Sequence, residues 1–165
     1  MDVTPTVGAS SRNRTITIEG KDVNLFIWDT AGEEKFASIS PLYVRNAKAA
    51  IIATSITDED SFGSIQKWVQ LLNDACDEHP PTLLAVNKID DVEHAKVEQD
   101  GVPERYGECF ESVHFVSAYT KEGVDQLFLE AAELAYAFVQ KHKTEQEEAT
   151  AIIEEVPEQE KKGCC

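Results

Sequence analysis

Polar residues with ligand-binding chemistry follow the apolar segment at residues 23–28. Asp29 comes soon after this segment, where a carboxylate at a strand end could hold a water molecule on Mg²⁺. Gly32 lies three residues further on, and its lack of a side chain would let a backbone N–H approach a phosphate closely. Asp and Gly are also common in ordinary strand-to-helix turns that bind no ligand. This segment alone therefore leaves both interpretations open.

A second candidate, Asn87-Lys88-Ile89-Asp90, follows the apolar residues 82–86. The carboxylate of Asp90 could accept hydrogen bonds from both N1–H and the exocyclic amine of guanine. Adenine lacks this pair of donors, so Asp90 would select the base. The Lys88 stem could lie over the base, and Asn87 could tie neighbouring loops together. A motif this short also arises by chance, but its place directly after a buried run favours the functional interpretation.

Two further segments carry weaker signals. Ser117 and Ala118 follow residues 113–116, and their backbone could contact the carbonyl oxygen of a purine. A plain strand end has the same sequence, so this pair alone is uninformative. Thr6 carries a hydroxyl that could bind Mg²⁺ when a terminal phosphate is present, and it is otherwise part of a turn.

Hydrophobic periodicity predicts the elements that must position these residues. Two alternating segments form a hairpin, three continuous apolar runs are typical of strands buried on both faces, and two segments have helical spacing. The hairpin strands lie at residues 14–18 and 23–28, and the buried strands at 49–53, 82–86 and 113–116. The first helix starts between about residues 58 and 61 and ends at 76, and the second lies at about 124–138. Their order predicts an α/β doubly wound domain, in which ligands bind beyond the carboxyl ends of the strands.

Composition excludes several classes of function. The 165 residues include 31 acidic and 15 basic side chains, for a formal net charge of −16, which argues against binding nucleic acid through its phosphates. A hydrophobic content of 42% is enough for a real core. The four cysteines are too few for a disulfide scaffold, and the four histidines lack metal-ligand spacing, so we expect no metal other than Mg²⁺.

The chain divides into a body and a tail by composition. Residues 144–165 lack apolar periodicity and are rich in Glu and Gln, so we expect an acidic disordered tail with no more than a transient helical turn at residues 149–153. Residues 1–143 then form one domain. The chain ends in Gly163-Cys164-Cys165, and two adjacent terminal cysteines require an explanation of their own.

The order of these motifs resembles the Ras superfamily of small GTPases, and specifically the Rab family. The segments that carry the resemblance are Pro5-Thr6-Val7-Gly8-Ala9, Trp28-Asp29-Thr30-Ala31-Gly32, Pro41-Leu42-Tyr43-Val44-Arg45-Asn46-Ala47, Asp60-Ser61-Phe62, Asn87-Lys88-Ile89-Asp90 and the prenylation signal Gly163-Cys164-Cys165. The first of these is most similar to the endosomal Rab branch. The resemblance covers about residues 4–143.

The resemblance implies a site for GTP or GDP with Mg²⁺. The implied nucleotide-binding residues are Thr6, Gly32, Asn87, Lys88, Asp90, Ser117 and Ala118. Thr6 and Asp29 would serve Mg²⁺, with Glu33 at the catalytic position. Trp28 and Tyr43 would form part of the effector surface, and Cys164 and Cys165 would carry prenyl groups.

The implied function is that of a GTP/GDP switch in vesicle-mediated, endosomal membrane traffic. Such a protein works with effectors, an exchange factor, a GTPase-activating protein, a prenyl transferase with its escort, and a GDP-dissociation inhibitor. It does not bind nucleic acid. Its expected place is the cytoplasmic face of an intracellular membrane, with a cytosolic pool.

The sequence also departs from the family pattern. No G-x-x-x-x-G-K-[ST] phosphate loop occurs in the 165 residues, so we expect an N-terminally truncated G domain without its first strand and helix. The family fold has three layers around a mixed, mostly parallel sheet. Without the missing strand, two strands of this sheet would lose a neighbour. Glu33 stands where the family has Gln, and Tyr119 stands where it has Lys. Ser11 stands where Rab proteins usually carry an aromatic residue. The sequence therefore leaves open whether this chain hydrolyses GTP. The alternatives to a GTP/GDP switch are a nucleotide-free or pseudo-GTPase interaction module, or a fragment of an incomplete gene model.

Overall fold

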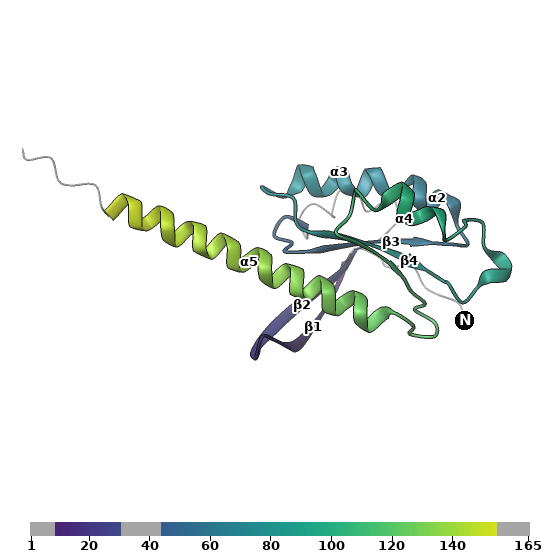
Figure 1. Ribbon diagram of the computed structural model, residues 1–165, viewed down its shortest axis with the longest axis horizontal. Helices are drawn as coiled ribbons and strands as arrows, with labels where there is room; N and C mark the ends of the chain where they lie inside the picture. The colour runs from purple at the N-terminus through teal and green to yellow at the C-terminus, as the bar shows by residue number, and fades with distance from the viewer. Residues whose placement is uncertain (1–8, 31–43, 155–165) are drawn as a thin grey trace, which may run out of the picture.

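The computed structural model describes residues 9–30 and 44–154 (Figure 1). Its elements in chain order are β1 (Ala9–Ile18), β2 (Lys21–Thr30), β3 (Ala50–Ser55), α2 (Glu59–Gly63), α3 (Ile65–Ala75), β4 (Thr82–Asn87), the 3₁₀ helix η2 (Val92–His94), α4 (Gly101–Tyr106), β5 (Ser112–Phe115) and α5 (Val124–Glu154). Strands and helices alternate from β3 onward, as the hydrophobic pattern predicts, and the α/β class is confirmed.

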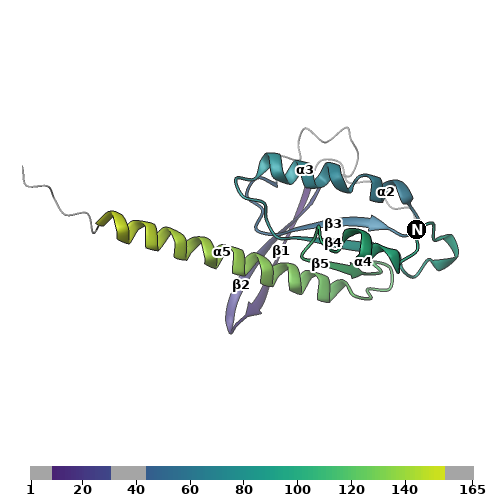
Figure 2. The same cartoon turned by 45° about the horizontal axis from the view of Figure 1, so that its top comes forward.

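Three parallel strands in the order β3-β4-β5 form the central sheet, with α3 above it and α5 below it in Figure 2. Successive side chains of β4 point to opposite faces. Leu84 and Val86 pack in a cluster with residues of α2 and α3, whereas Leu83 and Ala85 pack with residues of α5. Both faces of β4 are therefore covered, which explains its unbroken apolar sequence.

β1 and β2 pair as an antiparallel hairpin, with Ile18 opposite Lys21 at its turn. The turn residues Glu19 and Gly20 both have positive φ angles, 50° and 74°, as a tight turn between twisted strands requires. Along β2, alternate side chains are half-buried, and those between them include Phe26 and Trp28, which are 69% and 48% exposed. The hairpin therefore has one face toward the body and one toward solvent.

The expected mixed sheet is divided in two. Among the described residues, the hairpin forms a two-stranded sheet and β3, β4 and β5 form a separate three-stranded one. No strand of the described part of the chain joins β2 to β3, so each has one edge without a ladder of backbone hydrogen bonds. The described strands therefore form two separate sheets, with β2 and β3 each at an edge.

Helix α5 passes through the predicted boundary between residues 143 and 144 without a break and ends at Glu154. Residues 144–154, which the sequence assigns to a disordered tail, therefore belong to α5 in this structure. The Glu, Gln and Ala residues of this segment have high helix propensity, and Glu145 lies 3.9 Å from the Lys141 ammonium one turn earlier. Helix propensity thus prolongs α5 beyond its apolar face. Among the described helices, none is long and apolar enough to span a membrane.

Candidate functional site

The loops after β4 and β5 meet at one edge of the parallel sheet. Parallel strands end at the same edge, so residues 87–91 and 116–122 are brought side by side although about 30 positions separate them. The backbone confirms this contact, because Ile89 N donates to Val116 O at 3.3 Å. Five predicted binding residues, Asn87, Lys88, Asp90, Ser117 and Ala118, lie in these two loops.

Asn87 joins three loops at this edge. Its side-chain Oδ1 accepts hydrogen bonds from Lys88 N at 2.7 Å and from Ala118 N at 3.0 Å. Its backbone oxygen accepts one from Ile56 N at 3.1 Å, in the loop after β3. The sequence predicts such a tie for Asn87, and the structure confirms it. The Ala118 N–H, which could contact a purine oxygen, is engaged by Asn87 in this arrangement.

Ser117 positions the carboxylate of Asp90. The Ser117 hydroxyl donates to Asp90 Oδ1 at 2.5 Å and accepts from Thr120 N at 3.0 Å. Ser117 itself is fully buried, and its backbone N donates to Glu122 O at 3.0 Å. Asp90 is exposed, and its Oδ2 accepts no hydrogen bond from the described residues. One carboxylate oxygen is therefore held, and the other is available to a ligand.

Lys88 has a positive φ of 65° and an exposed side chain. Its Nζ donates to Thr57 Oγ1 at 3.4 Å, and Thr57 Oγ1 lies 2.9 Å from Ser55 Oγ. Ser55 and Thr57 were not among the predicted residues, although they follow the buried run 49–53 just as the other candidates follow theirs. That shared pattern was the signal that could have found them.

Gly123 is a third residue of this edge that the sequence patterns did not identify. It closes the loop that starts at Ser117, with a φ of 70°. A Cβ at this position would lie 2.8 Å from Phe115 O and 3.1 Å from Val116 Cγ1. Only glycine meets both conditions without strain. A glycine directly before the apolar periodicity of α5 was the available signal.

The remaining predicted site residues lie elsewhere. Trp28 and Asp29 are on β2, opposite Ser11 and Ser10 of β1 in the separate hairpin, and both are exposed. The other predicted residues, which lie outside the described part of the chain, are Thr6, Gly32, Glu33, Tyr43, Cys164 and Cys165. In residues 9–30 and 44–154, no group of three or more His, Cys, Asp or Glu side chains could hold a metal ion.

These loops fit a guanine base better than they fit a phosphate. An exposed carboxylate with one oxygen held by a buried hydroxyl can accept two hydrogen bonds from one edge of a base. Among the five predicted binding residues in these loops, only Lys88 carries an ammonium group, and this group contacts Thr57. The polar groups of these two loops are therefore suited to the hydrogen-bonding edge of a base.

Comparison with known proteins identifies the family of the chain. The sequence model of the Ras family matches residues 1–155. Human Rab-21 is 37% identical over 128 residues, which are 76% of this chain and 56% of Rab-21. Rab-21 of Geodia cydonium is 36% identical over 129 residues, which are 77% of this chain and 56% of that protein. Human Rab-12 is 34% identical over 127 residues, which are 75% of this chain and 51% of Rab-12.

The chain spans about half the length of the curated relatives it matches. The match with the Ras-family model extends over nearly all of the chain, from the hairpin to the end of α5. All three of these similar proteins are Rab proteins. The chain therefore belongs to the Ras family, among the Rab small GTPases.

Proposed function

We propose that this chain recognises the guanine base in a Rab-type GTP/GDP switch of vesicle-mediated membrane traffic. The observation that carries the proposal is the joining of two loops at the sheet edge, through Asn87 to Ala118 and through Ser117 to Asp90. These contacts hold the Asp90 carboxylate in place before a ligand binds. A preorganised acceptor loses less conformational entropy on binding than a mobile one.

The base specificity follows from hydrogen-bond chemistry. Asp90 accepts from N1–H and the exocyclic amine of guanine, and adenine offers no matching pair of donors. Xanthine carries a carbonyl oxygen in place of that amine, so an amide side chain at position 90 would fit it better than a carboxylate. Lys88 contributes its apolar stem to the face of the base, and Asn87 keeps the two loops together.

An NMR titration with GMP, AMP and XMP tests this base selection. In the unmodified chain we expect shifts at Ala118 and Asp90 with GMP and none with AMP. Asp90→Asn should reverse the preference toward XMP. Asp91→Asn is the matched control, because its carboxylate contacts His94 at 2.6 Å and should leave the preference for GMP unchanged. Equal responses to GMP and AMP in the unmodified chain would contradict the proposal.

We propose further that Thr6, Asp29 and Gly32 serve Mg²⁺ and the phosphates, and that Glu33 occupies the catalytic position. Mg²⁺ would neutralise charge on the phosphate oxygens when bound. An ionised Glu33 accepts a hydrogen bond from water but donates none toward the phosphoryl oxygens. Losing one such donor typically costs about 100- to 1,000-fold in rate.

Single-turnover hydrolysis tests the role of Glu33 in a chain extended upstream with a phosphate loop, strand and helix of a Rab protein. We expect Glu33→Gln to hydrolyse GTP faster than the unmodified sequence, most clearly with a GTPase-activating protein. Equal rates with and without the activator would show that this position does not limit hydrolysis.

The membrane role rests on the two terminal cysteines. We propose that Cys164 and Cys165 carry prenyl groups and place the protein on the cytoplasmic face of an endosomal membrane, because two lipid chains give stable anchoring. A prenyl transferase with its escort and a GDP-dissociation inhibitor would handle this lipidated end. Replacing both cysteines with Ser should move the protein to the soluble fraction, and unchanged membrane association would refute the idea.

A second candidate function, a nucleotide-independent interaction module, is favoured by the hairpin. Phe26 and Trp28 expose 69% and 48% of their surfaces on β2, and together with Tyr43 they would meet effectors. Binding to a Rab effector with and without GTP distinguishes the two candidates. A switch needs GTP for effector binding, whereas a module binds equally in both conditions.

A further inference from the structure

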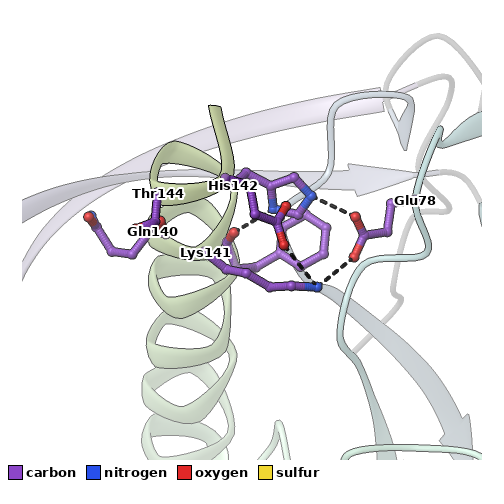
Figure 3. A network of polar contacts seen from close by, with 7 residues as sticks. Glu78, Gln140, Lys141, His142 and Thr144 are labelled. Atoms are coloured by element: carbon purple, nitrogen blue, oxygen red, sulfur yellow. Dashed lines mark hydrogen bonds and ion pairs between the residues drawn. The ribbon is translucent and has the colours of Figure 1, made fainter. Parts of the chain in front are cut away.

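A network of polar contacts joins α5 to the loop between α3 and β4 (Figure 3). His142 of α5 lies 2.6 Å from Glu78 Oε2 through its Nε2 and 2.7 Å from Phe138 O through its Nδ1. Glu78 lies 64 positions earlier in the chain, between Ala75 and Thr82. The imidazole therefore connects two segments that lie far apart in the sequence.

Both ring nitrogens of His142 face groups that can only accept hydrogen bonds. A backbone carbonyl oxygen and an ionised carboxylate have no proton to donate, so each contact needs a proton on the ring nitrogen. A neutral imidazole carries one such proton, and a doubly protonated ring carries two. The geometry is satisfied in full only by the charged ring. Loss of one proton would leave two lone pairs facing each other at one of these contacts.

Charges around His142 favour its protonated form. Lys141 Nζ lies 3.3 Å from Glu78 Oε1 and 3.9 Å from Glu145 Oε1, so two carboxylates face Lys141 and His142. The ring also packs against Phe138, with the ring centroids 4.4 Å apart and the ring planes tilted by 43°. A further cation, Lys48 of the segment before β3, lies over Phe138, with its Nζ 5.9 Å from the centroid of that ring. With His142 charged, the two carboxylates are balanced by Lys141 and His142.

The network lies where α5 leaves the body of the protein. Nearer its start, α5 contacts the sheet through Glu130, whose Oε2 is 2.9 Å from His114 Nε2, and the hairpin through Tyr136, which accepts from Lys21 Nζ at 3.3 Å. Beyond Glu145 the helix continues to Glu154, and Figures 1 and 2 show this end projecting away from the sheet. Among the described contacts of α5 with other elements, those of Lys141 and His142 with Glu78 lie nearest to the projecting end.

We propose that His142 and Glu78 form a pH-sensitive latch, in which the doubly protonated imidazole holds α5 against the loop between α3 and β4. Deprotonation of His142 removes one of its two hydrogen bonds and its charge, and the C-terminal half of α5 loosens. The latch therefore governs how the helix presents the residues that follow it. This inference stands on the contacts of α5 and does not depend on nucleotide binding.

The direction of the pH dependence follows from the two partners. The carbonyl of Phe138, and then Glu78, raise the pKa of His142 above its ordinary value of 6.5. The hydrogen bond from His142, with further help from Lys141, lowers the pKa of Glu78 below its ordinary value of 4.5. The His142 contribution is complete below pH 6.5 and is lost as pH rises through the raised value. The Glu78 contribution is complete above pH 4.5 and is lost as pH falls through the lowered value.

Hydrogen exchange of the amides of residues 138–145 in the full chain tests the latch. Exchange rates at pH 6 and pH 8.5 are divided by the intrinsic rates, which leaves the protection due to structure. In the unmodified chain we expect protection to fall about two- to fivefold between the two values, the effect of a solvent-exposed ion pair. In His142→Gln and in Glu78→Gln, protection should not change over this range.

His94→Gln is the matched control. His94 also contacts a carboxylate, Asp91, at 2.6 Å, but within one loop and away from α5. This variant should keep the fall in protection of the unmodified chain. A fall of the same size in His142→Gln would overturn the proposal. An NMR spectrum of the ring nitrogens that shows a neutral His142 at pH 6 would overturn it as well.

Discussion

Gly123→Ala should destabilise the protein through two separate effects. Gly123 has a φ of 70°, a conformation that an L-residue adopts at a cost of about 1–2 kcal/mol. The new Cβ would also lie 2.8 Å from Phe115 O, which belongs to β5. That contact forces the backbone at the end of β5 to shift, and overpacking of this kind typically costs about 1–3 kcal/mol. The expected loss in free energy of unfolding is therefore about 2–5 kcal/mol.

Gly20→Ala separates the two effects. Gly20 has a similar φ of 74°, but a Cβ there would meet no atom within 4 Å. Its expected cost is therefore the backbone term alone, about 1–2 kcal/mol. Urea titrations of both variants, followed by circular dichroism, give the difference between them. If the two variants lost the same free energy, the close approach of Gly123 to β5 would not contribute to stability.

Three further outcomes follow from other contacts. Leu84→Ala, at a fully buried side chain of β4, should lower the free energy of unfolding by about 2–5 kcal/mol in a urea titration. Val92→Ala, at an exposed side chain, is its control and should change it by less than about 0.5 kcal/mol. Asn87→Ala removes the acceptor of Ala118 N, so this amide should exchange faster in NMR, and an unchanged rate would contradict the loop tie. Burial raises the pKa of the Cys76 thiol, so iodoacetamide should modify Cys76 more slowly at pH 7.5 than the exposed Cys109, as peptide mass mapping can show.

The sequence by itself determined the elements whose signals are local. Residues 82–86 are apolar throughout because β4 is covered on both faces, and periodicity reports such burial directly. The same holds for the hairpin and for the apolar face of α5. The sequence also placed the candidate residues Asn87, Asp90 and Ser117 after buried strands, and the structure brings the three to one edge of the sheet.

Other features depended on contacts that the tertiary structure decides. The sequence does not show that Ser117 holds Asp90, or that Lys88 contacts Thr57, because both contacts cross between loops brought together by strand order. The end of α5 was misplaced for a related reason. Apolar periodicity stops before residue 144, but the helix continues where its residues have high helix propensity.

Pairing partners were the least predictable part. Each strand of the hairpin and of the parallel sheet was predicted, but their division into two sheets depends on which edges find a partner in space. The contact of His142 with Glu78 is of the same kind, since 64 positions separate the two residues. Sequence patterns report the burial of a segment relative to water, whereas the choice of neighbour is made by the packing of the whole chain.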